Sequence, residues 1–321
     1  MTTRVLLSAP YMLPIIDGFR PMLDSAGIEL VLARVEERLT EDELLAFAGQ
    51  VDGVVCGDDV FTRRVLEAFA PRLKIVSKWG TGIDSIDLQA AKRLGISVGN
   101  TPGAFAHPVG DSVLAYILAF ARRGPWMDQA MKAGRWEKIP GRTLRECTLG
   151  VVGVGNCGRE VLRRAKGFGM RLLGNDIVPI PKAFIDEVGV EMLSLEALLE
   201  RSDFISLNCD LNPTSFRLVN AAALGRLRPS AILINVARGS IVDEPALIEA
   251  LRSEQLAGAA LDVFEREPLP LDSPLRAFEN VILAPHNANS SPEAWARVHR
   301  NTLRNLFLGL GLSVPADLET E

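Results

Sequence analysis

The chain has few of the residues that build disulfide or metal frameworks. Its 321 residues include four cysteines and three histidines. The cysteines show no C-x-x-C spacing and the histidines no metal-ligand spacing, so we expect reduced thiols and no metal site. Reduced cysteines are typical of the cytoplasm, which is the location that we expect.

Long apolar runs and concentrated positive charge are also missing. The longest wholly apolar stretch, residues 113–121, is too short to cross a bilayer. Arg4 is followed by only a brief apolar run before Pro10, which does not make a secretory signal. The net charge is −5, the pI is near 5.5, and no block is rich in Lys and Arg. We therefore expect no nucleic acid and no membrane as partners.

The chain is rich in short apolar runs that alternate with helical patterns. Hydrophobic residues make up 48% of it and the mean hydropathy is +0.16, as expected for parallel strands buried on both faces. Within residues 1–100 the alternation predicts a parallel α/β sheet. The predicted strands are 5–8, 28–32, 53–56 and 74–76, and the predicted helices are 41–47, 62–69 and 87–94.

A second series of strands follows a helix predicted at 108–122. Its strands are predicted at 148–153, 171–175, 204–208, 231–236, 257–262 and 281–284, before a last helix at 292–310. This order predicts an α/β fold with two doubly wound parallel-sheet domains. A Rossmann NAD-binding domain over 101–286 would be inserted into a smaller, flavodoxin-like substrate domain made of 1–100 and 287–321.

A glycine-rich turn directly follows the first strand of the second series. In Gly153-Val154-Gly155-Asn156-Cys157-Gly158, the first glycine allows a tight turn and the second lets backbone approach a pyrophosphate. The third lets the next helix pack closely, and the N–H groups at the start of that helix face the phosphates. Alone the motif is a weak signal, because a merely tight strand-to-helix turn has the same pattern.

Asp176 strengthens this interpretation. It lies 18 residues after Gly158, at the end of the second strand of the series. An acid there accepts hydrogen bonds from ribose hydroxyls and repels a 2′-phosphate. No Arg or Lys follows at once, so we expect NAD rather than NADP; the alternative is a surface Asp that merely ends a strand.

Three polar residues follow strands of the same series and could carry chemistry. His286 suits proton transfer at neutral pH, whereas His107 and His299 are expected to be structural or solvated. Glu267 could fix the tautomer of His286, and Arg238 could hold a carboxylate with its guanidinium fork. The alternative for His286 is a plain loop histidine.

These residues and several other motifs resemble the D-isomer-specific 2-hydroxyacid dehydrogenases. The matching segments are 78–84 (KWGTGID), 100–102 (NTP), 153–158 (GVGNCG), 235–243, 262–268 and 285–286. The resemblance covers nearly the whole chain and, in its substrate loop, is similar to phosphoglycerate dehydrogenases that lack a C-terminal regulatory domain. It implies hydride transfer between a nicotinamide and C2 of a D-2-hydroxy acid, and a homodimer in which Trp136 reaches the partner's site.

The resemblance also implies roles for individual residues. Arg238 would bind substrate, and Glu267 would orient and electrostatically tune His286, the acid/base. Backbone N–H groups of the loop Gly80-Thr81-Gly82 would hold the substrate carboxylate. Lys78 could meet a phosphate or second carboxylate, or simply be a snorkelling lysine. Besides the glycine-rich turn and Asp176, the expected cofactor contacts are Cys209, Val236, Ala237, Arg238, Asp262 and His286.

The sequence departs from the family pattern at three places. Asn208-Cys209-Asp210 stands where the family commonly has His and then Pro. Asp111 replaces a more usual Glu, and Asn287-Ala288-Asn289 replaces a glycine-containing turn. The floor of the nicotinamide site is therefore expected to be altered.

Several functions stay open at this point. The substrate would be 3-phosphoglycerate, or the protein would be a hydroxypyruvate or glyoxylate reductase. A different class is an NAD(H)-sensing, corepressor-like binding protein of the same fold. Formate dehydrogenases have a Gln where this chain has Glu267. The presence of Glu267 therefore disfavours formate oxidation. The glycine-rich loop of this chain lacks the G-K-[ST] ending of phosphoryl-transfer enzymes, which excludes that class.

Overall fold

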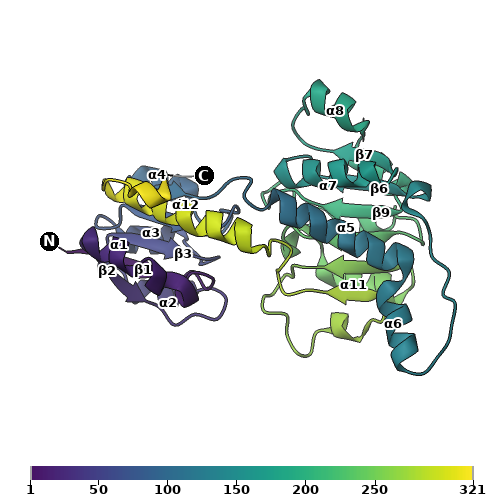
Figure 1. Cartoon of the computed structure of the whole chain (residues 1–321), viewed down its shortest axis with the longest axis horizontal. Helices are drawn as coiled ribbons and strands as arrows, with labels where there is room; N and C mark the ends of the chain where they lie inside the picture. The colour runs from purple at the N-terminus through teal and green to yellow at the C-terminus, as the bar shows by residue number, and fades with distance from the viewer. Residues whose placement is uncertain (1, 320–321) are drawn as a thin grey trace. The chain divides into compact units, whose positions relative to one another are not determined.

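The computed structural model describes residues 2–319 and forms two compact units. The first unit contains the chain up to Ala104 and again from Ser291 onward, and the second runs from Phe105 to Ser290. The boundaries expected from the sequence, 100/101 and 286/287, each lie a few residues earlier. Figure 1 shows the two units with helices and strands labelled.

The first unit is built on a five-stranded parallel sheet. The strands β1 (Thr3–Leu7), β2 (Ile28–Leu32), β3 (Gly53–Cys56), β4 (Ile75–Lys78) and β5 (Ser97–Gly99) lie in the order β2-β1-β3-β4-β5. This is the flavodoxin-like order. Strand β5 was not predicted, because three residues that include Ser and Gly make no apolar run.

Helices of the first unit cover this sheet. They are α1 (Arg20–Ser25), α2 (Glu41–Leu45), α3 (Arg63–Phe69), α4 (Leu88–Leu94) and α12 (Pro292–Leu310). The ends of α4 follow from its sequence: the Asp87 side chain accepts from Ala90 N, and Gly95 takes a left-handed φ of 71°. Beneath the helices lies a core that contains Leu6, Phe61, Phe69 and Val76.

The last helix, α12, packs on β3, β4 and β5. The Ser77 hydroxyl donates to Thr302 O at 2.7 Å, which joins β4 to the helix. Leu306 is fully buried and lies over β3, where a Cβ on Gly53 would be 3.0 Å from its Cδ1. The C-terminal helix is therefore an integral part of the first unit.

The second unit contains a seven-stranded parallel sheet in the order β12-β11-β10-β9-β6-β7-β8. The strands are β6 (Thr148–Val152), β7 (Arg171–Asn175), β8 (Glu191–Met192), β9 (Phe204–Leu207), β10 (Ile232–Asn235), β11 (Gly258–Leu261) and β12 (Val281–Leu283). All six predicted strands form. Strand β8 was missed because it has only two residues. Both predicted parallel sheets, and with them the fold class, are confirmed.

The order of this sheet reverses at β6. Strand β6 pairs with β7 on one side and with β9 on the other, so the switch point lies between β6 and β9. Parallel α/β sheets bind ligands outside the carboxyl ends of their strands at such a point. The ends of β6 and β9, at Gly153 and Asn208, therefore flank the expected crevice.

Seven helices of the second unit are described. They are α5 (Ala106–Arg122), α6 (Gly124–Lys132), α7 (Asn156–Gly167), α8 (Lys182–Val188), α9 (Leu195–Arg201), α10 (Ala221–Leu224) and α11 (Glu244–Arg252). Helices α5 and α7 pack against each other, as Figure 1 shows. Within residues 2–319, no helix is long and apolar enough to cross a membrane.

Replacing Leu306 by Ala tests the role of α12 in the first unit. The change leaves a cavity under the helix and is expected to lower the free energy of unfolding by about 2–5 kcal/mol, measured by urea denaturation. Leu308 on the same helix is 52% exposed, so Leu308→Ala serves as the control and should change stability by less than about 1 kcal/mol. Equal losses in the two variants would contradict this packing.

Candidate active site

The glycine-rich turn at the end of β6 is closely packed at its first and third glycines and open at its second. Gly153 has a φ of 88°, and a Cβ there would lie 2.5 Å from Cys209 N. A Cβ on Gly158 would lie 2.0 Å from Gly153 O. Gly155, just before α7, faces open space, since a Cβ there would have nothing within 4 Å. The turn thus combines close packing with an open approach to the helix start, as a pyrophosphate requires.

Asp176 fixes this turn from the neighbouring strand. Its carboxylate accepts from Val154 N at 2.7 Å and from Val178 N at 3.0 Å. Each carboxylate oxygen keeps a lone pair for a further donor. The next side chains, Ile177 and Val178, are exposed and apolar, so neither of them offers a cation to a 2′-phosphate. The arrangement fits the ribose of NAD.

Two thiols lie at the turn, Cys157 within it and Cys209 next to Gly153. Burial raises the pKa of Cys157 and of Cys209 to about 11, so both are neutral at physiological pH. Beside them, Asn208 donates from Nδ2 to the Ser206 hydroxyl at 2.9 Å. Within the described residues its buried Oδ1 has no hydrogen-bond partner. The family's usual His is thus replaced by an amide that holds the end of β9.

Arg238 lies on a turn that is held by a buried amide. The Asn235 side chain, only 1% exposed, donates to Arg238 O at 2.9 Å and accepts from Ala237 N at 3.1 Å. A Cβ on Gly239 would lie 1.9 Å from the carbonyl carbon of Phe264, so this turn presses on the segment after β11. Sequence reasoning did not single out the clamp by Asn235, because a polar residue at a strand end resembles any strand terminus.

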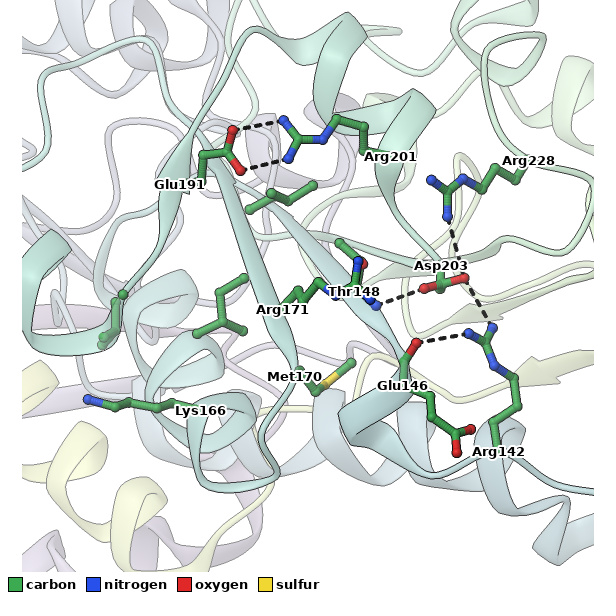
Figure 2. Close-up of a pocket in the computed structure, with 14 residues that line it drawn as sticks. Arg142, Glu146, Thr148, Lys166, Met170, Arg171, Glu191, Arg201, Asp203 and Arg228 are labelled. Atoms are coloured by element: carbon green, nitrogen blue, oxygen red, sulfur yellow. Dashed lines mark hydrogen bonds and ion pairs between the residues drawn. The ribbon is translucent and has the colours of Figure 1, made fainter.

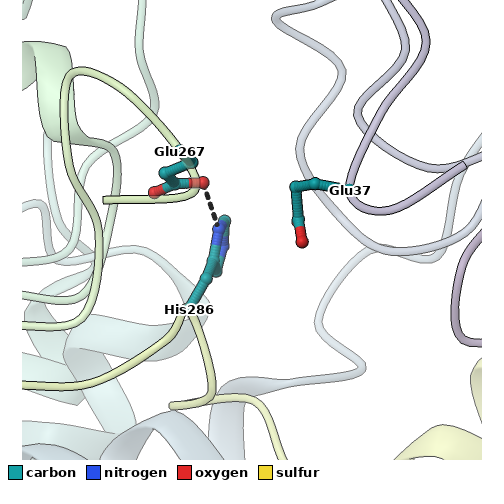
Figure 3. A group of neighbouring side chains, drawn as sticks. All are labelled: Glu37, Glu267 and His286. Atoms are coloured by element: carbon teal, nitrogen blue, oxygen red, sulfur yellow. Dashed lines mark hydrogen bonds and ion pairs between the residues drawn. The ribbon is translucent and has the colours of Figure 1, made fainter. Parts of the chain in front are cut away.

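The segment after β11 carries Glu267, and the turn after β12 carries His286. His286 Nδ1 lies 3.0 Å from Glu267 Oε2, as the dashed line in Figure 3 shows. The other carboxylate oxygen of Glu267 accepts from Phe264 N at 2.9 Å. One oxygen of the Glu267 carboxylate is therefore held by a backbone N–H, and the other is paired with the imidazole of His286.

The backbone of His286 has a left-handed φ of 51°, which is unfavourable for a non-glycine residue. Asp262 stabilises it. Its carbonyl accepts from His286 N at 2.7 Å, and its carboxylate accepts from Asn287 N at 2.8 Å and Ala288 N at 2.9 Å. Because these donors are backbone groups, the turn forms without the family's glycine.

The carboxylate of Asp262 is buried, with the residue only 1% exposed. Burial raises the pKa of the Asp262 carboxyl, while its two backbone hydrogen bonds and His286 oppose this rise. Tyr116 on α5 hydrogen-bonds the same carboxylate, and the pKa of its phenol is raised by burial and by Asp262. Nothing in the sequence signalled this tyrosine, because a Tyr in an apolar helix also suits a plain core position.

In the first unit, the loop Gly80-Thr81-Gly82 is held by the 100–102 motif. Thr101 N donates to Gly80 O at 2.8 Å, and the Thr81 hydroxyl donates to Thr101 O at 2.9 Å. Asn100 Nδ2 donates to Thr81 O at 2.6 Å. Two sequence motifs that lie some twenty residues apart therefore form one structure.

Lys78, at the end of β4, is turned inward and is 3% exposed. Its ammonium lies 3.1 Å from Asp58 Oδ1 and donates to Trp79 O at 2.9 Å. The charge of Lys78 is thus already balanced within the first unit. This placement suits a structural lysine, and the substrate contact suggested for Lys78 stays a prediction.

The other two histidines have structural or surface positions. His299 is buried and accepts from Trp79 Nε1 at 2.9 Å, and burial lowers the pKa of its imidazole. His107 is largely exposed and pairs with Glu160 at 3.1 Å. Among the three histidines, His286 is the one paired with a carboxylate at the carboxyl edge of the sheet.

Comparison with known proteins places this geometry in a family. Residues 114–288 match the NAD-binding domain of the D-isomer specific 2-hydroxyacid dehydrogenases. A glyoxylate reductase of Korarchaeum cryptofilum is 41% identical over 266 residues, which cover 81% of this chain and 80% of that protein. A D-3-phosphoglycerate dehydrogenase of Methanocaldococcus jannaschii is 39% identical over 260 residues, 80% of this chain but only 49% of that protein.

A solved structure agrees with these sequence matches. The D-lactate dehydrogenase of Aquifex aeolicus, complexed with NAD and lactic acid, superposes with a TM-score of 0.83 at 26% identity and covers 94% of this chain and 93% of its own. The family and the NAD cofactor predicted from the sequence are therefore confirmed. The chain belongs to the D-isomer specific 2-hydroxyacid dehydrogenases, which are NAD-dependent oxidoreductases.

Proposed function

We propose that the protein reduces a small, unphosphorylated 2-keto acid of the glyoxylate and hydroxypyruvate class to the D-2-hydroxy acid. The observation that carries this proposal is the pair of His286 Nδ1 and Glu267 Oε2 at 3.0 Å, on a turn fixed by Asp262. NADH, when bound, supplies the hydride for the carbonyl carbon.

His286 supplies the proton in this reaction. Glu267 accepts the hydrogen bond from Nδ1–H, so the imidazole exchanges its other proton at Nε2. As the carbonyl oxygen gains negative charge, protonated His286 donates from Nε2 to it and becomes neutral. In the oxidative direction the neutral imidazole takes the hydroxyl proton. The carboxylate of Glu267 stabilises the imidazolium and keeps it oriented.

Arg238 and the loop Gly80-Thr81-Gly82 are proposed to hold the substrate. The guanidinium of Arg238 matches a carboxylate with two parallel N–H donors. The clamp of its turn by Asn235 limits the freedom that binding would otherwise have to remove. Backbone N–H groups of Thr81 and Gly82 are proposed as further donors to the substrate carboxylate.

Several contacts with the cofactor belong to the same proposal. The turn from Gly153 to Gly158, including Asn156 and Cys157, would hold the pyrophosphate, and Asp176 the adenosine ribose. Backbone at Val236 and Ala237, together with Asp262, would face the nicotinamide, and backbone at Cys209 would line the crevice at the end of β9. The close approach of Gly153 to Cys209 N supports the last of these.

The surroundings of the substrate loop favour an unphosphorylated substrate. The charge of Lys78 beside the loop is balanced by Asp58. Trp79, which precedes the loop, has Tyr11 at 4.9 Å and Trp295 at 5.9 Å between ring centroids. An aromatic cluster would desolvate a phosphate without compensating its charge. The glyoxylate reductase and hydroxypyruvate reductase relatives, matched over most of their length, agree with this choice.

The proposal includes a homodimer and a cytoplasmic location. Exposed apolar side chains gather on α6 and just after it, namely Met127, Met131 and Trp136, and Trp136 is 84% exposed. Such a patch favours burial against a second copy of the chain. All four cysteines are free, which suits a reducing compartment.

Replacing His286 by Ala removes the proposed acid. We expect kcat to fall by about 10²–10⁴-fold, while the NADH dissociation constant, measured by fluorescence titration, stays within about threefold. His107→Ala is the matched control and should turn over normally. Near-normal turnover of the His286 variant would rule out the assignment.

Asp176 is proposed to select NAD. Asp176→Ala should raise the KM for NADH by about tenfold, since it removes a charge-assisted hydrogen bond, and should narrow the preference over NADPH. Asp186→Ala, on the exposed face of α8, is the control and should leave both values unchanged. An unchanged ratio of kcat/KM for the two cofactors in the Asp176 variant would contradict this role.

A substrate panel tests the reaction itself. NADH oxidation is measured with glyoxylate, hydroxypyruvate and pyruvate, and NAD reduction with 3-phosphoglycerate. We expect the highest kcat/KM with the unphosphorylated keto acids. A preference for 3-phosphoglycerate would contradict the choice of an unphosphorylated substrate. No activity with any of these substrates would favour the NAD(H)-sensing alternative.

A further inference from the structure

A cavity of about 460 Å³ opens in the second unit at the end of the sheet where the strands begin. Figure 2 shows it with Thr148 at the start of β6, Arg171 at the start of β7, and Asp203 just before β9. Because these strands are parallel, their other ends carry the glycine-rich turn, Asp176 and Asn208. The cavity is therefore separate from the proposed cofactor site.

Basic side chains outnumber acidic ones around this cavity. Its charged lining consists of five cations and three carboxylates, namely Arg142, Lys166, Arg171, Arg201 and Arg228 against Glu146, Glu191 and Asp203. The chain as a whole carries a net charge of −5. A local excess of positive charge in an acidic protein attracts anions.

The positive charges are only partly neutralised. Arg201 and Glu191 form a two-bond pair at 2.7 and 2.8 Å and balance each other. Arg142 and Arg228 instead share the single carboxylate of Asp203, at 3.1 and 3.8 Å. That carboxylate also accepts from Thr148 N at 2.7 Å. Two guanidinium groups thus converge on one negative charge that is already hydrogen-bonded to backbone.

Neutral carbonyl groups orient these cations without cancelling their charge. Arg142 donates to Glu146 O at 3.3 Å, and Arg228 Nε donates to Glu200 O at 3.0 Å. Lys166 Nζ donates to Glu187 O. Arg171 lies at the start of β7 and lines the same cavity. The cavity therefore presents several oriented N–H donors, and its lining holds more cations than carboxylates.

We propose that this cavity binds a multivalent phosphate anion. Its volume lies within the range of small-molecule sites, about 300–1,000 Å³. Guanidinium groups bind phosphate oxygens with two parallel N–H donors, and two convergent arginines match more than one phosphate oxygen. One wall is apolar, formed by Met170, Leu172 and Val188, so an organic phosphate gains additional contact there.

The test is calorimetric titration of inorganic pyrophosphate into the whole protein saturated with NADH, so that the glycine-rich turn is occupied. We expect about one pyrophosphate per chain, with an affinity that falls as salt rises. Arg171→Gln/Arg228→Gln should weaken binding by at least about tenfold, since each change removes a charge-assisted donor. ADP in the same titration distinguishes an organic from an inorganic phosphate, because only ADP would gain affinity from the apolar wall.

A matched control is Arg93→Gln/Arg252→Gln, which removes two exposed arginines that do not line the cavity and should bind pyrophosphate as the wild type does. Thermal unfolding of both double variants verifies that they fold. The proposal is overturned if pyrophosphate does not bind when NADH is saturating. It is equally overturned if the Arg171/Arg228 variant binds with unchanged affinity.

Discussion

The carboxylate of Asp262 holds the turn on which the proposed chemistry depends. The carboxylate accepts hydrogen bonds from the backbone N–H groups of the two residues after His286. The backbone carbonyl of Asp262 accepts one from His286 N. These three hydrogen bonds keep His286 in a left-handed conformation that costs on the order of 1–3 kcal/mol. Without them the imidazole would relax away from Glu267. A buried carboxylate thus sets the position of the residue that is proposed to transfer the proton.

The other elements of the site are fixed by the same kind of contact between backbone and a side chain. Asn235 clamps the turn of Arg238, and Asp176 clamps the glycine-rich turn. Gly239 lets the Arg238 turn press on the segment that leads to Glu267. These turns all follow the carboxyl ends of strands of one parallel sheet. The sheet therefore places them along one edge. The loops are therefore held by a few polar side chains that the sheet brings together.

The sequence predicted the fold well because its parallel strands are apolar and evenly spaced. It failed at β5 and β8, which are short and are formed by pairing with a neighbouring strand. Arg238, Glu267 and His286 were predicted as site residues because each follows a strand of one sheet. Their clamps were not, since Asn235 and Tyr116 carry no pattern that distinguishes them from ordinary strand ends or helix interiors. For Lys78 the sequence shows a charge but not Asp58, the carboxylate that balances it.

Glu267 is proposed to keep a proton on Nδ1 of His286, so that Nε2 exchanges the proton of the substrate. Nitrogen-15 NMR of histidine-labelled protein tests this most directly. His299, which accepts from Trp79 at Nδ1, supplies the opposite tautomer in the same spectrum. We expect a protonated Nδ1 on His286 that is hydrogen-bonded in the wild type and perturbed in Glu267→Gln. A neutral His286 with its proton on Nε2 and an unprotonated Nδ1 would contradict it.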